Sequence, residues 1–220
     1  MGKPRSPKGR AALVSQRLAE LYPGTAKELC ELDHQNPFQL LAATILSAQT
    51  TDARVNMVTP VLFDRYPTPT SLASAIPEEL EEVVHSTGFY RNKAKSLIGM
   101  ARALEDRFDG SVPVSIEDLV TVPGTGRKTA NVVRSVAMGL PGLPVDTHVL
   151  RLSKRLGLVA GDLADDPVKV EYALNDLVPA GERGAFSLRV ILHGRRVCDA
   201  RKPQCGACVL ADFCPSAGKV

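Results

Sequence analysis

Residues 115–149 read SIEDLVTVPGTGRKTANVVRSVAMGLPGLPVDTHV, and this stretch predicts two short helices joined by a tight turn. Ser115 is a suitable N-cap for the first helix, because its hydroxyl can accept a bond from an unpaired backbone amide. Pro123 disfavours helical geometry in the residue before it, so the first helix must end by Val122. A second helix is predicted from about Arg127, with apolar residues at helical spacing.

The turn between these helices suits a phosphate group. Gly124 and Gly126 can adopt positive φ, and neither has a side chain to obstruct a ligand. Unpaired amides at the start of the second helix would point at the ligand, and the helix dipole favours an anion there. Lys128 lies in the first turn of that helix, where the dipole favours a neutral, nucleophilic amine. Asp146 follows in the same stretch and supplies a carboxylate.

Each of these features also has an ordinary explanation. A turn with two glycines is a common connector, and a single lysine in a first turn is usually a solvated charge. An aspartate before Thr-His is more often an N-cap than a catalyst. The conjunction of all three is much more specific than any one of them.

A group of cysteines near the C-terminus has the spacing C-x6-C-x2-C-x5-C, formed by Cys198, Cys205, Cys208 and Cys214. Thiols this close together favour a metal site over disulfides. Zinc and an iron–sulfur cluster both fit the ligands, and general spacing favours zinc slightly. Cys30 lies far from this group and is expected to be a small core residue.

Composition sets broader limits. The chain has 220 residues, 44% of them hydrophobic, and a net charge of only +3, so charge alone does not establish nucleic-acid binding. Residues 1–10 contain four basic residues, two prolines and no acid, which predicts a disordered tail. No apolar run approaches the roughly 20 residues needed to span a membrane. No secretory-type apolar segment follows the N-terminal charges, which predicts a cytoplasmic protein.

The rest of the chain shows helical patterns and no sustained alternation of period two, so we predict an all-α fold. The expected helices cover about 13–22, 27–32, 37–49, 52–66, 147–158, 166–179 and 182–198. Residues 77–104 faintly repeat the order of the central stretch, with a helix, a glycine turn and a basic helix. In that repeat Gly88 takes the place of Gly126, and Phe89 lies at the tip of the turn.

The segments VPGTGRKTANVV and VDTHV resemble the endonuclease III family of base-excision DNA glycosylases, which belong to the helix-hairpin-helix superfamily. The resemblance covers about Leu13 to Cys214. It implies that Lys128 is the Schiff-base lysine and Asp146 its paired aspartate. The family commonly has a hydrophobic residue at the place of Thr125, a departure that is harmless if this position contributes mainly backbone to DNA binding.

Further site residues follow from the same resemblance. The segment LSAQTTD matches a second family signature, in which Gln49 enters the gap left by a flipped base. Phe89 lies in the loop that inserts beside the lesion, where the family often has an aliphatic residue. The cysteine spacing matches the family's 4Fe–4S signature, so the resemblance reverses the slight preference for zinc. The cluster would present Arg201 and Lys202 to the DNA backbone.

The implied architecture is all-α, with two helical domains flanking a DNA-binding cleft. Residues 1–29 would form an N-terminal tail and a helix packing with the cluster domain. Residues 30–140 would form a six-helix domain containing the helix-hairpin-helix at about 115–138. Residues 141–220 would form the iron–sulfur domain. Lys128 and Asp146 would then face each other across the cleft.

The implied function is repair of double-stranded DNA carrying a damaged pyrimidine or an abasic site. The enzyme would remove the base through a Schiff base and cut the strand 3′ to the site by β-elimination. A monomer in the cytoplasm, acting at the nucleoid and not at a membrane, is expected. Alternatives are a monofunctional adenine-mismatch relative, a pyrimidine-dimer specialist, a non-catalytic DNA-binding module and a purely structural metal protein.

Overall fold

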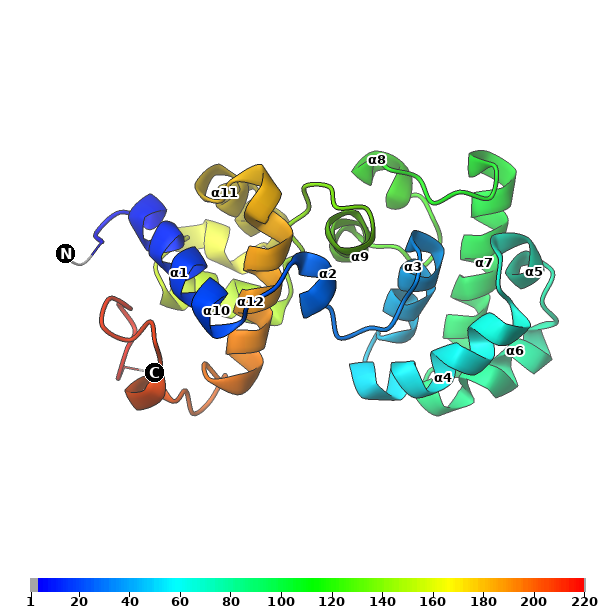
Figure 1. Cartoon of the computed structure of the whole chain (residues 1–220), viewed down its shortest axis with the longest axis horizontal. Coiled ribbons are helices and arrows are strands. Elements are labelled where there is room, and N and C mark those ends of the chain that lie inside the picture. Colours follow the sequence, from blue (N-terminus) through cyan, green and yellow to red (C-terminus); the bar gives the residue numbers. More distant parts are fainter. Residues whose placement is uncertain (1–3, 220) are drawn as a thin grey trace. The chain divides into compact units, whose positions relative to one another are not determined.

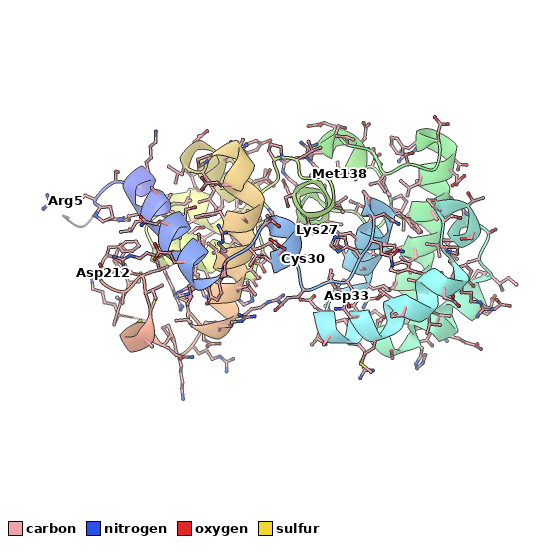
Figure 2. All side chains as sticks on the ribbon, viewed as in Figure 1. Arg5, Lys27, Cys30, Asp33, Met138 and Asp212 are labelled. Carbon is pink, nitrogen blue, oxygen red and sulfur yellow. The ribbon has the colours of Figure 1, made fainter. Side chains whose placement is uncertain are left out.

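The computed structural model describes residues 4–219, and it confirms the all-α prediction (Figure 1). That range contains no β-strand and no helix long and apolar enough to cross a membrane. The chain forms two compact units. One comprises the residues up to Leu29 together with those from Gly139 onward. The other comprises Cys30–Met138, whose end residues are labelled in Figure 2.

The Cys30–Met138 unit is built around α3, in which eight of ten residues are buried. Asn36 caps this helix by accepting a bond from the Gln39 amide at 2.9 Å, and Pro37 occupies its first turn. Helices α4, α7 and α9 pack against it. The unit comprises α3 (Pro37–Leu46), α4 (Asp52–Arg65), α5 (Pro69–Ala73), α6 (Pro77–Val84), η1 (His85–Thr87), α7 (Tyr90–Phe108), α8 (Ile116–Leu119), α9 (Arg127–Val132) and the π-helical η2 (Val133–Ala137).

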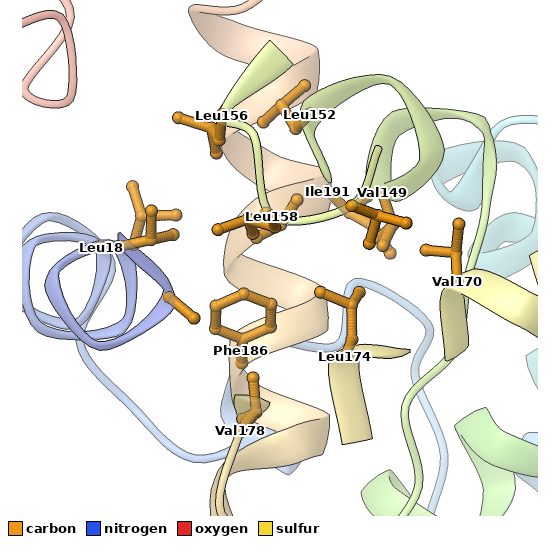
Figure 3. Close-up of a cluster of buried hydrophobic side chains, with 14 of the residues drawn as sticks. Leu18, Val149, Leu152, Leu156, Leu158, Val170, Leu174, Val178, Phe186 and Ile191 are labelled. Carbon is orange, nitrogen blue, oxygen red and sulfur yellow. The ribbon is translucent and has the colours of Figure 1, made fainter. Parts of the chain in front are cut away.

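The other unit has its own core around α12. Phe186 is 1% exposed and lies among Leu18, Leu174 and Val178 (Figure 3). The N-terminal helix α1 therefore packs in the same core as the C-terminal helices. The unit comprises α1 (Pro7–Leu21), α2 (Ala26–Leu29), α10 (Thr147–Arg155), η3 (Gly161–Asp165), α11 (Pro167–Leu177), η4 (Ala180–Glu182), α12 (Arg183–Arg196) and η5 (Cys205–Ala207).

The predicted disordered tail is wrong from Pro7 onward. Helix α1 begins there, because the Ser6 hydroxyl accepts a bond from the Gly9 amide at 3.1 Å and a proline suits the first turn. Arg10 is also fixed, since its guanidinium donates to the Gly157 carbonyl at 3.1 Å. Residues 1–3 of the predicted tail lie outside the described residues.

The position predicted for Cys30 is also corrected. Helix α2 stops at Leu29, so half-buried Cys30 follows the helix instead of lying in it.

Candidate functional site

The helix-turn-helix of residues 115–132 forms as predicted. The Ser115 hydroxyl accepts a bond from the Asp118 amide at 2.9 Å and so caps α8. The helix ends at Leu119, and the chain turns through Pro123 before α9 begins at Arg127. This turn connects two helices of the same compact unit.

The two glycines of the turn have different roles. Gly124 has a φ of 79°, and a Cβ added there would lie 3.1 Å from Ile45 Cδ1 and 3.1 Å from Ser96 Cβ. Its small size is therefore needed for packing against α3 and α7. Gly126 has a φ of −88°, so it does not use the positive φ that a glycine can adopt. A Cβ at Gly126 would have no neighbour within 4 Å, which leaves the start of α9 open.

Thr125 lies between these glycines and is buried at 6% exposure. Its hydroxyl has no hydrogen-bond partner among the described residues. Its amide is satisfied, because it donates to the Val122 carbonyl at 3.0 Å. An unsatisfied buried hydroxyl costs roughly 1–3 kcal/mol, so this departure from an apolar side chain has an energetic consequence.

Lys128 is the second residue of α9, and its side chain is exposed. The N-cap of the helix is Gly126, which has no side chain to bond the first-turn amides. No hydrogen bond or ion pair to Lys128 occurs among residues 4–219. Ala130 and the two residues after it are buried, and they anchor the helix. The arrangement combines an exposed amine with a helix start that has no side-chain cap.

Gln49 and Phe89 lie in two exposed loops of this same unit. Helix α3 ends at Leu46, three residues before its predicted end, and Gln49 follows in the left-handed region with a φ of 55°. Phe89 has a φ of 47° and is 64% exposed. Its exposure excludes a core role. A buried lysine between these loops, Lys93, was missed in the sequence, where it resembles an ordinary surface charge of a basic helix.

Asp146 lies in the other unit and caps α10. Its Oδ1 accepts bonds from the amides of His148 and Val149 at 2.8 and 2.9 Å. The ordinary N-cap interpretation is therefore correct for one oxygen. No hydrogen bond to Oδ2 occurs within the described part of the chain, and the side chain is partly exposed. That oxygen is available for a second role.

His148 is held by its own unit. Arg151 Nη2 lies 3.0 Å from His148 Nδ1, and because a guanidinium only donates, Nδ1 is the acceptor. Burial lowers the pKa of His148, which favours this neutral form. A Cβ at Gly194 would lie 2.9 Å from His148 Cβ, so α10 and α12 approach closely here. These contacts give His148 a structural role beside Asp146.

The four C-terminal cysteines line one cavity. Burial, followed by the charge of neighbouring thiolates, raises the pKa of Cys208 and Cys214. A bound cationic group would reverse this shift and stabilise the thiolates. Between residues 4 and 219, no three His, Cys, Asp or Glu side chains have the close arrangement of a site for a single ion. Four cysteine sulfurs around one cavity are a ligand set that an iron–sulfur cluster uses.

Polar groups of α10 and α12 contact these sulfurs. Arg155 Nη1 lies 3.3 Å from Cys198 Sγ, and His193 Nε2 lies 3.3 Å from Cys208 Sγ. His193 is 1% exposed, and burial lowers its pKa to about 4. Such contacts orient thiolate ligands around a metal group. Arg201 and Lys202 are exposed on the loop between the first two cysteines.

Comparison with known proteins agrees with this arrangement. Residues 42–180 match the HhH-GPD superfamily of base excision DNA repair proteins, and residues 198–214 match the iron–sulfur binding domain of endonuclease III. Endonuclease III of Synechocystis is 54% identical over 98% of this chain and 96% of its own length. The chain belongs to the endonuclease III family. Escherichia coli endonuclease III is 39% identical over 92% of this chain and 95% of its own.

Solved structures extend the similarity to the fold. An endonuclease III trapped in a covalent intermediate with DNA has 43% sequence identity to this chain and a TM-score of 0.87, covering 96% of each chain. A thermostable thymine-DNA glycosylase has 21% identity and a TM-score of 0.83, over 97% of each chain, and shares the fold. The family match at residues 198–214 identifies the cysteine cavity as an iron–sulfur site, which corrects the preference for zinc drawn from spacing alone.

Proposed function

We propose that the chain is a bifunctional DNA glycosylase and abasic-site lyase that removes damaged pyrimidines from duplex DNA. The observation that carries the proposal is the exposed Lys128 amine in the first turn of α9, behind a turn with open space at Gly126. Membership of the endonuclease III family gives this amine a chemical context.

The reaction begins when the unprotonated Lys128 amine attacks C1′ of the damaged nucleotide. The new C1′–N bond forms as the bond to the base breaks, and the base leaves with the bonding electrons and takes up a proton. The sugar ring opens to give a protonated Schiff base, which makes the 2′ proton acidic. Loss of that proton expels the 3′ phosphate and cuts the strand. Water finally hydrolyses the Schiff base and frees Lys128.

Asp146 is the proposed carboxylate of this reaction. One oxygen is fixed by the α10 amides, which orients the side chain without fully occupying it. The other oxygen stabilises positive charge that develops at C1′, or accepts a proton from the attacking amine. The amides of His148 and Val149 hold this carboxylate at the N-terminus of α10.

DNA binding is assigned to two features of the Cys30–Met138 unit, the turn before α9 and the loops of Gln49 and Phe89. The turn of Gly124, Thr125 and Gly126 leaves space for a phosphate at the start of α9, where the helix dipole favours an anion. Gln49 and Phe89 enter the gap left by the flipped nucleotide, since both are exposed on loops. Extruding a nucleotide costs a few kcal/mol, and the cost is smallest for damaged bases.

Cys198, Cys205, Cys208 and Cys214 would hold a 4Fe–4S cluster. When bound, the cluster supplies the cross-link that fixes a segment with little core of its own. Arg201 and Lys202 then approach the phosphate backbone, where each cation contributes a salt-dependent share of affinity. Partly buried thiols held by Arg155 and His193 support this assignment. We further propose a monomer that acts on DNA in the cytoplasm.

The test is borohydride trapping with a duplex containing thymine glycol. A covalent adduct and a strand cut are expected with the native chain and not with an undamaged duplex. Asp146→Asn is the informative variant, because asparagine is an equally good N-cap and removes only the charge. It should keep the melting temperature within a few degrees and lower base excision. Base loss without an adduct would instead establish a monofunctional enzyme.

A further inference from the structure

Lys93 is a buried cation in the Cys30–Met138 unit. It lies on α7, and only 5% of its surface is exposed. Burying an ammonium group is costly unless it is well paired, so natural proteins rarely bury lysine. Burial lowers the pKa of Lys93, as expected for a desolvated amine. The presence of a buried amine at this position therefore requires an explanation.

The contacts of the amine supply one. Lys93 Nζ donates to the Thr50 hydroxyl and to the Thr87 carbonyl, both at 2.7 Å. The Thr50 hydroxyl in turn donates to the Thr87 carbonyl. Thr87 is 3% exposed, and its own hydroxyl donates to the Val84 carbonyl at 2.7 Å. The Lys93 amine therefore links two loops that are far apart in the sequence.

These are the two loops that carry Gln49 and Phe89. Thr50 directly follows Gln49, and Thr87 lies two residues before Phe89. Both neighbours have positive φ, a conformation that costs a non-glycine residue roughly 1–3 kcal/mol. Only Asp109 shares this conformation among the other non-glycine residues from 4 to 219. Such conformations persist where surrounding contacts enforce them, and the bonds of Lys93 are next to both.

We propose that Lys93 is a positioning residue that holds the Gln49 and Phe89 loops as one preformed unit for the gap left by the flipped nucleotide. The inference rests on the role proposed above for these two residues. Lys93 does not touch the substrate. Its amine sets the separation of the two loops, so that the side chains of Gln49 and Phe89 enter the duplex together. Because the loops are already ordered, binding DNA costs less conformational entropy.

The first test compares Lys93→Met with Lys95→Met, because Lys95 is an exposed lysine on the same helix. Methionine keeps most of the stem and removes the amine. Excision of thymine glycol should fall about 10- to 100-fold in Lys93→Met, the loss expected from misplacing a group by about 1 Å. Cleavage of a preformed abasic site should fall less than about threefold, because extrusion is easier without a base. Lys95→Met should match the native chain in both assays.

The second test uses Thr50, which remains informative if Lys93→Met does not fold. Thr50→Val removes the hydroxyl and should reproduce the selective loss of excision. Thr50→Ser restores the hydroxyl and should restore excision. Fluorescence of 2-aminopurine paired opposite the lesion should report less base extrusion in Thr50→Val than in Thr50→Ser. The double variant with Lys93→Met should be no worse than the poorer single variant, since both act through one contact.

Three results would overturn the inference. One is unchanged excision in Lys93→Met, and another is an equal fall in excision and abasic cleavage. The third is equal activity and extrusion in Thr50→Val and Thr50→Ser. Failure of the proposed function is distinguishable, because the native chain itself would then form no borohydride adduct with either substrate.

Discussion

Two segments of the Cys30–Met138 unit have the same order of elements but different turns. In the first, α6 leads through η1 and Gly88 to α7. In the second, α8 leads through the turn at Gly124 to α9. Gly88 and Phe89 both have positive φ, and the first turn displays an aromatic side chain. In the second turn only Gly124 has positive φ, and the turn displays backbone. In the proposed function, the first segment inserts a side chain into DNA and the second binds a phosphate.

The lysines of the two following helices differ in the same way. Lys93 is buried, with two oxygen acceptors at 2.7 Å, and it ties loops together. Lys128 is exposed, near the open space at Gly126, and it is the proposed nucleophile. Similar helix-turn-helix patterns thus give one buried amine that bonds two loops and one exposed amine that we propose for the chemistry. The position of each lysine in the helix-turn-helix pattern does not distinguish these two roles, but the burial of its side chain does.

The largest effect should come from removing the exposed amine. Lys128→Ala is expected to reduce strand cleavage by roughly a thousandfold or more, equivalent to about 4 kcal/mol of transition-state stabilisation. Stability should change little, because the side chain has no partner to lose. Single-turnover kinetics on a thymine glycol duplex, with Lys95→Ala as control, measure the effect. Activity within tenfold of the native chain would assign the chemistry to another residue.

The next prediction distinguishes the roles of the two glycines of the second turn in stability and in DNA binding. Gly124→Ala should lower the free energy of unfolding by about 1–3 kcal/mol, because it forces positive φ on alanine and crowds Ile45 and Ser96. Gly126→Ser should change that free energy by less than about 0.5 kcal/mol, since serine is a good N-cap. It should nevertheless weaken DNA binding by obstructing the phosphate. Urea denaturation and fluorescence anisotropy measure the pair, and equal stabilities would refute the distinction.

A smaller effect is expected at the tip of the first turn. Phe89→Gly relieves the left-handed strain and removes the inserted ring. Unfolding free energy should stay constant or rise by up to about 1 kcal/mol, while excision falls roughly tenfold. Thermal melts and excision rates on one preparation test both halves of the prediction. A loss of stability would mean that the ring packs against the fold.

The smallest effect concerns the hydroxyl between the two glycines. Thr125→Val removes a buried hydroxyl without a partner and should raise the free energy of unfolding by about 1 kcal/mol. Thr125→Ser, which keeps the hydroxyl and loses a methyl group, is the matched control and should destabilise. DNA affinity should stay unchanged if the position contributes only backbone. A stability loss in Thr125→Val would show that the hydroxyl is satisfied.

Much of the fold follows from local signals in the sequence. Ser115, Pro123 and Asn36 determine helix ends through their own caps and ring geometry, so those boundaries were predictable. Helix α1 was placed too late, because the basic and proline content of the tail outweighed the Ser6 cap. The π-helical turn at Val133–Ala137 has no comparable signal in the sequence.

The site residues also divide into those that have a signal in the sequence and those that have none. The resemblance of short motifs singles out Lys128, Asp146 and the four cysteines, because their chemistry requires particular residue types. Lys93 could not be found this way, since its role depends on contacts with Thr50 and Thr87, which only the fold brings together. The left-handed backbone of Gln49 and Phe89 also has no local cause in the sequence, because neither residue type favours positive φ.

The most direct test identifies which lysine forms the covalent bond. The borohydride-trapped complex with a thymine glycol duplex is digested with protease and nuclease, and the modified peptide is sequenced by mass spectrometry. The account predicts that the sugar remnant is attached to Lys128, with Lys93 unmodified. Attachment to Lys93, or to any lysine outside α9, would contradict the division of roles between the two segments.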